Sequence, residues 1–137
     1  IGYELGKIYG KIIRHTAPYK YIDIIVPVPL HPKKQHTRGY NQAAKFAEGL
    51  AESMHKEWNS HWLVRTENTE TQTQKSRIDR FKNVQTAFEL SAAAPPKANI
   101  LLVDDVITTG ATLEACTAVL LASKNYKVSL AAIALTS

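Results

Sequence analysis

Hydrophobic positions along the chain follow two different spacings, which separate predicted helices from predicted strands. Near the start, apolar side chains recur every three or four residues and predict an amphipathic helix over residues 2–15. Its apolar positions are Leu5, Ile8, Tyr9, Ile12 and Ile13. The next apolar stretch, YIDIIVPV (21–28), is β-branched and nearly continuous, as in a buried strand. We expect it to end at Pro27 and Pro29, because proline cannot donate to a strand ladder.

The middle of the chain contains a second helical stripe and then a polar gap. A helix is predicted over residues 41–58, with an apolar face made of Ala43, Ala47, Leu50, Ala51, Met54 and Trp58. The segments WLVRT (62–66) and VQTAFEL (84–90) are strand-like. Between them, eight polar residues without periodicity (67–74) precede a capping-box spacing that allows a short helix over residues 76–83.

The last third of the chain has a strand, a helix and a strand in succession. ILLVDD (100–105) is the clearest strand, and it follows the turn-rich connector SAAAPPKA (91–98). A helical stripe over residues 113–121 comes next, and KVSLAAIAL (127–135) is the last predicted strand. Because strands alternate with helices, we predict an α/β fold with a mostly parallel central sheet flanked by helices on both faces. Its 137 residues suit one domain, residues 1–137.

Composition narrows the setting in which the protein works. No apolar run reaches the roughly 18 residues that a membrane span needs, and the first residues carry too many charges for a secretory signal. A single cysteine, Cys116, excludes an intramolecular disulfide framework and a cysteine set with zinc spacing, so we expect a reducing, cytoplasmic setting. The start on Ile1 rather than Met indicates that residues upstream were removed or are not included.

The net charge of +5 and the pI near 9.4 favour anionic partners, whether phosphorylated metabolites or nucleic acid. The basic residues gather in two short clusters: His31, Lys33, Lys34, His36 and Arg38, then Lys75, Arg77, Arg80 and Lys82. Two short clusters suit a phosphate site better than a continuous stripe would, although ordinary solvated loops would have the same composition.

The stretch ILLVDDVITTGAT (100–112) carries the candidate chemistry. In a parallel sheet, ligands bind beyond the carboxyl ends of the strands, and Asp104 and Asp105 are expected at that edge. The loop from Thr108 to Thr112 leads into a helix whose first N–H groups lack partners, so it can hold a phosphate. Gly110 would let the backbone turn tightly beside that phosphate.

The adjacent carboxylates would repel a phosphate, so they need another part of the ligand. Ribose hydroxyls, which donate hydrogen bonds, and a magnesium ion (Mg²⁺) are the groups that carboxylates bind. A phosphorylated ribose therefore fits both halves of the motif. A strand end with an Asx-turn and a threonine cap is the structural alternative, but it explains only one aspartate and one threonine.

These residues carry a family resemblance. ILLVDDVITTGAT resembles the phosphoribosyl-pyrophosphate-binding motif of type I phosphoribosyltransferases. The order of VPVPLHP (26–32), RGYNQA (38–43) and TQTQKSRIDRFKNVQTAF (71–88) resembles the ComF family of competence-associated proteins over nearly the whole chain. ComF proteins commonly carry an N-terminal zinc-binding cysteine cluster, which this sequence lacks.

The resemblance implies roles for individual residues. It implies that Asp104 and Asp105 hold the ribose hydroxyls and Mg²⁺ and take part in catalysis. It also implies that the phosphate is held by Thr108, Thr109, Gly110, Ala111 and Thr112. The pyrophosphate group would lie near Val28 and Pro29, and Arg38, with Lys33 and Lys34, would assist. For this whole basic loop, the alternative of an ordinary surface loop stays open.

The polar segment 67–76 matches the place of the mobile catalytic loop of such enzymes. Departure of pyrophosphate builds positive charge on the sugar, which water would trap, so a closing loop is useful. Lys75, Arg77 and Arg80 are then the candidates that stabilise the leaving group. A solvated loop and short helix are the structural alternative.

Several function classes fit less well. A P-loop nucleotidase would need Gly-Lys-Ser/Thr after the strand, and a receiver domain would need its acidic pair early in the chain. Cys116 lies on an apparently buried helix face and is a poor amidotransferase nucleophile. We expect a phosphoribosyltransferase with an unidentified acceptor. The rival is a non-catalytic component of DNA uptake that keeps the ligand site as a sensor or retains only the fold. A homodimer and DNA-processing partners stay open.

Overall fold

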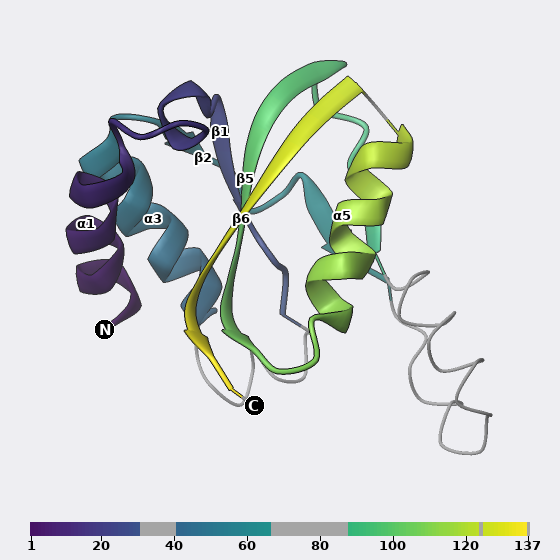
Figure 1. The fold of residues 1–137 in the computed structure, drawn as a ribbon. Coiled ribbons are helices and arrows are strands. Elements are labelled where there is room, and N and C mark those ends of the chain that lie inside the picture. Colours follow the sequence, from purple (N-terminus) through teal and green to yellow (C-terminus); the bar gives the residue numbers. More distant parts are fainter. Residues whose placement is uncertain (31–40, 67–87, 124, 137) are drawn as a thin grey trace.

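Four parallel strands form the central sheet of the protein in a computed structural model that describes residues 1–30, 41–66, 88–123 and 125–136 (Figure 1). Their spatial order is β2 (Glu57–Trp58), β1 (Ile24–Pro27), β5 (Lys97–Ile107) and β6 (Asn125–Leu135). The short 3₁₀ helix η1 (Tyr19–Tyr21) precedes β1, so this strand begins three residues later than predicted. Its end at a proline is confirmed.

Helices cover both faces of the sheet, as predicted. α1 (Gly2–Ile13) and α3 (Gln42–Met54) lie on one face, and α5 (Ala111–Ser123) lies on the other (Figure 1). The mostly parallel α/β architecture is therefore confirmed. The helices predicted over residues 2–15 and 113–121 both form, and the predicted strand at 127–135 lies within β6.

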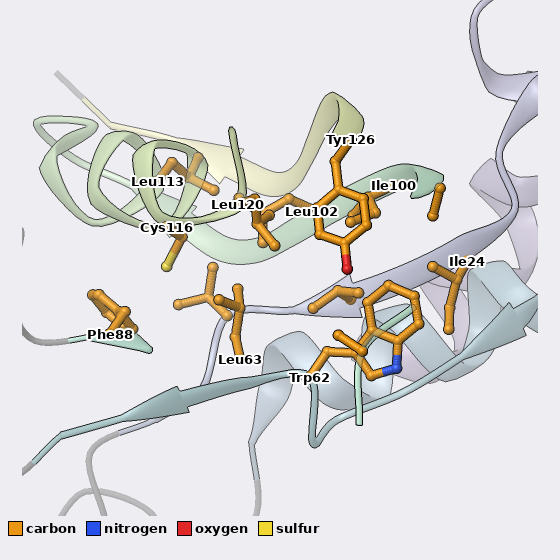
Figure 2. Packing of buried hydrophobic residues seen from close by; sticks show 14 of the residues in the cluster. Ile24, Trp62, Leu63, Phe88, Ile100, Leu102, Leu113, Cys116, Leu120 and Tyr126 are labelled. Atoms are coloured by element: carbon orange, nitrogen blue, oxygen red, sulfur yellow. The ribbon is translucent and has the colours of Figure 1, made fainter. Parts of the chain in front are cut away.

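Alternate residues of the two central strands point to opposite faces and build two apolar clusters. Ile24, Ile100 and Leu102 pack on the side of α5, together with Leu113, Cys116 and Leu120 from that helix (Figure 2). Ile25, Leu101 and Val103 pack on the side of α3, against Phe46, Ala47 and Leu50. The continuous apolar runs noted in these strands thus reflect burial on both faces.

A small antiparallel sheet borders the cluster on the α5 side. It consists of β3 (Leu63–Arg65) and β4 (Phe88–Leu90), within the segments predicted as strands at 62–66 and 84–90. Leu63 and Phe88 point into the cluster (Figure 2). Trp62 stacks on Tyr126 with ring centroids 6.1 Å apart. The predicted helix over residues 76–83 lies outside the described residues.

The face of α1 that packs on α3 is made of glycines rather than of the apolar stripe. Gly2, Gly6 and Gly10 are its buried residues, whereas Ile8 is 57% exposed and Ile12 is 63% exposed. A Cβ added at Gly6 would lie 2.4 Å from the carbonyl oxygen of Phe46, so only glycine permits this approach. Apolar spacing identified the helix correctly but did not identify its main packing face.

The helix predicted over residues 41–58 is shorter than expected. Asn41 caps its start, because Asn41 Oδ1 accepts hydrogen bonds from the backbone N–H of Ala43 (2.9 Å) and Ala44 (3.3 Å). α3 ends at Met54, and His55 follows in the left-handed conformation with φ 58°. Trp58 does not belong to the helix. It pairs with Ile25 as part of β2, so its placement on the helical face was wrong.

Candidate functional site

The candidate site begins where β1 and β5 separate. The two strands run side by side as far as Pro27 and Val103, and the N–H of Val28 donates to the carbonyl of Val103 (2.8 Å). Beyond that point β5 continues beside β6 alone. Asp104 is therefore the first residue of β5 past the end of β1, at the carboxyl edge of the parallel sheet.

Asp104 and Asp105 lie inside β5, as the predicted strand 100–105 has them, and β5 continues to Ile107. Asp104 Oδ1 accepts a hydrogen bond from the N–H of Asp105 (2.8 Å), and Asp105 Oδ1 accepts one from the N–H of Val106 (2.8 Å). Burial raises the pKa of Asp104 to about 6. The backbone N–H of Asp105 lowers this pKa, the Asp105 side chain raises it, and the charge of Arg65 lowers it.

The loop after β5 forms a hollow at the start of α5. This hollow has a volume of about 30 Å³, and it is lined by Asp104 and residues 106–113. Thr108, Thr109 and Gly110 form the loop itself, while Ala111 and Thr112 begin the helix. Asp104 and the five predicted phosphate-binding residues therefore share one hollow.

Two local contacts shape this loop. Thr109 Oγ1 accepts a hydrogen bond from the N–H of Ala111 (3.3 Å), and the carbonyl of Gly110 accepts the first helical bond from Glu114 (2.9 Å). Gly110 has φ +82°, which favours glycine, and no heavy atom lies within 4 Å of the place a Cβ would occupy. Glycine is favoured at this position because of the positive φ angle, and the open space beside it leaves room for a ligand.

Val28 and Pro29 lie at the same edge of the sheet as the acidic pair. The carbonyl of Val28 accepts a hydrogen bond from Asn41 Nδ2 (3.1 Å), which ties this loop to the start of α3. The carbonyl of Pro29 accepts one from Arg65 Nη1 (3.4 Å). Asn41 thus connects the loop to the helix as well as capping that helix.

Arg65 is a site residue that the sequence analysis missed. It is half-buried at the end of β3, and its charge influences Asp104. The only sequence signal was its position, as the single charged residue of the short strand WLVRT. Nothing in that strand indicates that it lies beside the end of β1.

The basic residues proposed from the sequence, Lys33, Lys34, Arg38, Lys75, Arg77 and Arg80, lie outside the described residues, as does the segment 67–76. Their roles remain predictions. Cys116 is buried, and burial raises the pKa of its thiol to about 12, which disfavours the reactive thiolate.

Within the described ranges, no three His, Cys, Asp or Glu residues come together as a metal site. The acidic pair offers two carboxylates, which matches how proteins hold Mg²⁺ when substrate phosphates and water complete the coordination. In the same parts of the chain, no helix is long and apolar enough to cross a membrane.

Sequence comparison finds relatives among proteins linked to competence and DNA utilization. The chain is 35% identical over 100 residues to DNA utilization protein YhgH of Escherichia coli K12, and 37% identical over 102 residues to competence protein F of Haemophilus influenzae. Each match covers 73% of this chain but 44% of the relative, so the chain spans less than half of these proteins. Competence protein ComFC of Bacillus subtilis is 37% identical over 90 residues, or 66% of this chain and 35% of the relative. No family model matches.

Structure comparison finds phosphoribosyltransferases. An adenine phosphoribosyltransferase has a TM-score of 0.65 at 16% identity, with 99% of this chain and 70% of that chain covered. The glutamine phosphoribosylpyrophosphate amidotransferase of Bacillus subtilis has a TM-score of 0.64 at 18% identity. The match covers 96% of this chain and 26% of the amidotransferase chain. At these identities the likeness shows the fold alone. The resemblance noted in the sequence is confirmed: the chain is a homologue of the competence proteins F and ComFC and has the type I phosphoribosyltransferase fold.

Proposed function

We propose that this protein binds phosphoribosyl pyrophosphate with Mg²⁺ and transfers its phosphoribosyl group to an acceptor. One observation carries the proposal: Asp104 and the whole run 108–112 line a single hollow at the start of α5. The hollow lies at the carboxyl edge of a parallel sheet, where such folds bind ligands. The shared fold with phosphoribosyltransferases supports the same conclusion.

Each part of the ligand has a chemically matched partner. The first turn of α5 offers backbone N–H groups that have no acceptor within the helix, and it is the positive end of the helix dipole, so it suits the 5′-phosphate. Asp104 and Asp105 accept hydrogen bonds from the ribose hydroxyls. The same carboxylates would hold Mg²⁺, which supplies charge neutralisation for the pyrophosphate group. The loop at Val28 and Pro29 faces the side from which pyrophosphate leaves.

In the reaction, the bond between the ribose C1 and the pyrophosphate oxygen breaks, and a bond from C1 to the acceptor forms. The electron pair of the broken bond leaves with pyrophosphate. Positive charge develops on the sugar, and the negative carboxylates of Asp104 and Asp105 stabilise it. The acceptor must be a nucleophile that reaches C1 at this edge of the sheet.

Isothermal titration calorimetry tests the proposal. Phosphoribosyl pyrophosphate with Mg²⁺ is expected to bind and to raise the melting temperature, because it binds only the folded state. Replacing both Asp104 and Asp105 with asparagine is expected to remove the Mg²⁺ dependence of binding. The control, Glu4→Gln with Glu57→Gln, removes two exposed carboxylates from α1 and β2 and is expected to bind like the parent. Absence of heat and of a thermal shift at millimolar ligand would refute the proposal.

A second variant separates the two halves of the site. Thr109→Val removes the hydroxyl that shapes the phosphate loop, so ribose 5-phosphate is expected to bind more weakly while the dependence on Mg²⁺ persists. Thr16→Val changes an exposed threonine in the turn after α1 and is the matched control. Equal binding by both variants would place the phosphate elsewhere.

A second candidate function comes from the names of the sequence relatives, which refer to DNA utilization and competence. In that case the domain would bind DNA or a DNA-uptake partner without catalysing transfer. A salt titration of single-stranded DNA binding distinguishes the two, since each neutralised phosphate releases counterions. We expect weak binding that phosphoribosyl pyrophosphate displaces. Tight DNA binding with a steep salt dependence, unaffected by the ligand, would favour the second candidate.

A further inference from the structure

The outer side of β6 is a long strand edge that the proposed function does not use. β6 runs over 11 residues and ends the spatial order β2-β1-β5-β6, so no described strand pairs with its outer side (Figure 1). The opposite edge of the sheet, β2, has only two residues, and one of them is Glu57. Proteins protect sheet edges from pairing with other chains by keeping them short or charged. β2 has both properties, and β6 is long and almost uncharged.

The side chains of this edge are mostly apolar or small. Lys127 is the single charged residue of β6, and the run VSLAAIAL (128–135) contains neither proline nor glycine. Two leucines of the run are open to solvent, because Leu130 is 45% exposed and Leu135 is 77% exposed. A long apolar edge of this kind favours the addition of a further strand.

The backbone groups of β6 point alternately to its two sides. The N–H of Asn125 donates to the carbonyl of Pro96, just before β5 (3.2 Å), so the odd-numbered residues in the first part of β6 turn toward β5. The even-numbered residues from Tyr126 to Ala132 therefore turn their N–H and carbonyl groups outward. Among the described residues, no strand occupies these groups, and an added strand would bind them.

A second copy of the chain matches this edge. In a two-fold dimer the same edge meets itself, with the two β6 strands antiparallel. Lys127 meets its own copy only if the axis passes through residue 127, whereas an axis within the run 128–135 sets apolar and small side chains against one another. The run carries no charge pattern that would select a different chain as the partner.

The edge is also large enough for a stable dimer. The 11 residues of β6 span about 36 Å at the rise of a strand. A standard interface buries about 800 Å² on each partner, so a contact of this length has to be about 22 Å wide. The helix α5 packs beside β6 on one face of the sheet, and its Leu121 is 54% exposed. A sheet with its side chains and one helix layer of about 10–12 Å supplies that width.

We propose that two copies of this protein join along β6, antiparallel and about a two-fold axis, so that their central sheets form one continuous sheet. The inference is independent of the proposed function. Because the two β6 strands are antiparallel, the carboxyl edges of the two copies, with Asp104, point to opposite ends of the joined sheet. Each candidate site therefore stays at its own end of the dimer.

Two substitutions disturb this interface without removing a fully buried side chain. Ala132→Pro puts proline where the N–H turns outward, a position that an edge strand tolerates but that can no longer donate to a partner strand. Leu130→Lys places a positive charge at a half-exposed position and sets a like charge in the second copy. Val64→Lys is the matched control, because Val64 is 41% exposed on β3, a strand outside the interface.

Sedimentation velocity over a concentration series measures the association. The parent is expected to reach twice the chain mass of 15.2 kDa, with a dissociation constant of about 10 μM or tighter. Leu130→Lys is expected to weaken the dimer by at least about tenfold, because like charges opposed across an antiparallel pair are destabilising. Ala132→Pro is expected to be a monomer with the circular dichroism spectrum of the parent, and Val64→Lys is expected to associate like the parent. Leu130→Lys decides the question if the proline variant does not fold.

Three results would overturn the inference. The first is a parent that stays monomeric at about 100 μM, which would leave the edge to a strand of another protein. The second is a dimer that persists in both variants, because the interface would then lie on another surface. The third is loss of the folded spectrum in Leu130→Lys, because β6 would then be covered within the single chain. None of these results depends on whether phosphoribosyl pyrophosphate binds.

Discussion

Replacing Asp104 with asparagine is expected to make the ligand-free protein more stable at neutral pH while it impairs ligand binding. The substitution keeps the shape of the side chain, and asparagine Oδ1 can still accept the hydrogen bond from the N–H of Asp105. What changes is the charge. Burial raises the pKa of Asp104 from 3.8 to about 6. At pH 7 the folded protein therefore carries a charged carboxylate in a partly buried position, which costs free energy.

The sign and size of the effect follow from this pKa. The folded state binds the proton of Asp104 more tightly than the unfolded state does. This tighter proton binding stabilises the folded state. The stabilisation is fully present below pH 3.8 and is lost as the pH rises through about 6. A shift of about two pKa units corresponds to about 3 kcal/mol, and the partial exposure of Asp104 reduces this to about 1–2 kcal/mol. We expect Asp104→Asn to raise the melting temperature by about 4–8 °C at pH 7.5.

Urea denaturation of parent and variant at several pH values between 4 and 7.5 measures this difference. The free energy of unfolding gained by Asp104→Asn is expected to be near zero at pH 4 and to grow up to pH 7. Asp23→Asn is the control, because Asp23 is exposed and its Oδ2 accepts a backbone hydrogen bond of the same length from Asn99 (2.8 Å). A destabilised Asp104→Asn variant, or a difference that does not change with pH, would contradict the reasoning.

Three stability predictions concern the scaffold, each measured by urea denaturation. Gly49→Ala is expected to cost at least about 2 kcal/mol, because its Cβ would lie 2.1 Å from the carbonyl oxygen of Tyr3 and would push α1 away from α3. Gly2→Ala, whose Cβ would lie 3.0 Å from its nearest atoms, is expected to cost clearly less, and equal effects would refute the close packing. Leu120→Ala is expected to cost about 2–5 kcal/mol, since Leu120 is fully buried, and a cost under 1 kcal/mol would mean that the cluster re-forms around the cavity. Asn41→Ala is expected to cost about 1 kcal/mol through loss of the cap on α3, and an unchanged stability would show that the cap is dispensable.

Much of the fold follows from local spacing. Strands β1, β5 and β6 and helix α5 were predictable because their side chains are buried on faces that repeat with a fixed period. The candidate phosphate loop was predictable for a related reason. Asp104 and residues 108–112 are neighbours in sequence, so one strand and the helix after it suffice to bring them to the same hollow.

Other features depended on segments that are far apart in the chain. Trp58 has apolar helical spacing, but Met54 ends the helix and Trp58 pairs with Ile25 instead. The glycine face of α1 is buried because Gly49, more than 35 residues later, lets two backbones approach closely. A pattern of apolar residues does not identify a face that packs closely through glycines, because glycine has no side chain.

Arg65 shows the same limit within the candidate site. In the sequence it is one basic residue at the end of a short strand, far from both Pro29 and Asp104. Its position beside them arises because β3 pairs with β4, whose Phe88 is anchored in the cluster under α5. Local periodicity reports which face of an element is buried. The partners that meet across that face, and the electrostatic surroundings they create, depend on how distant segments pack together.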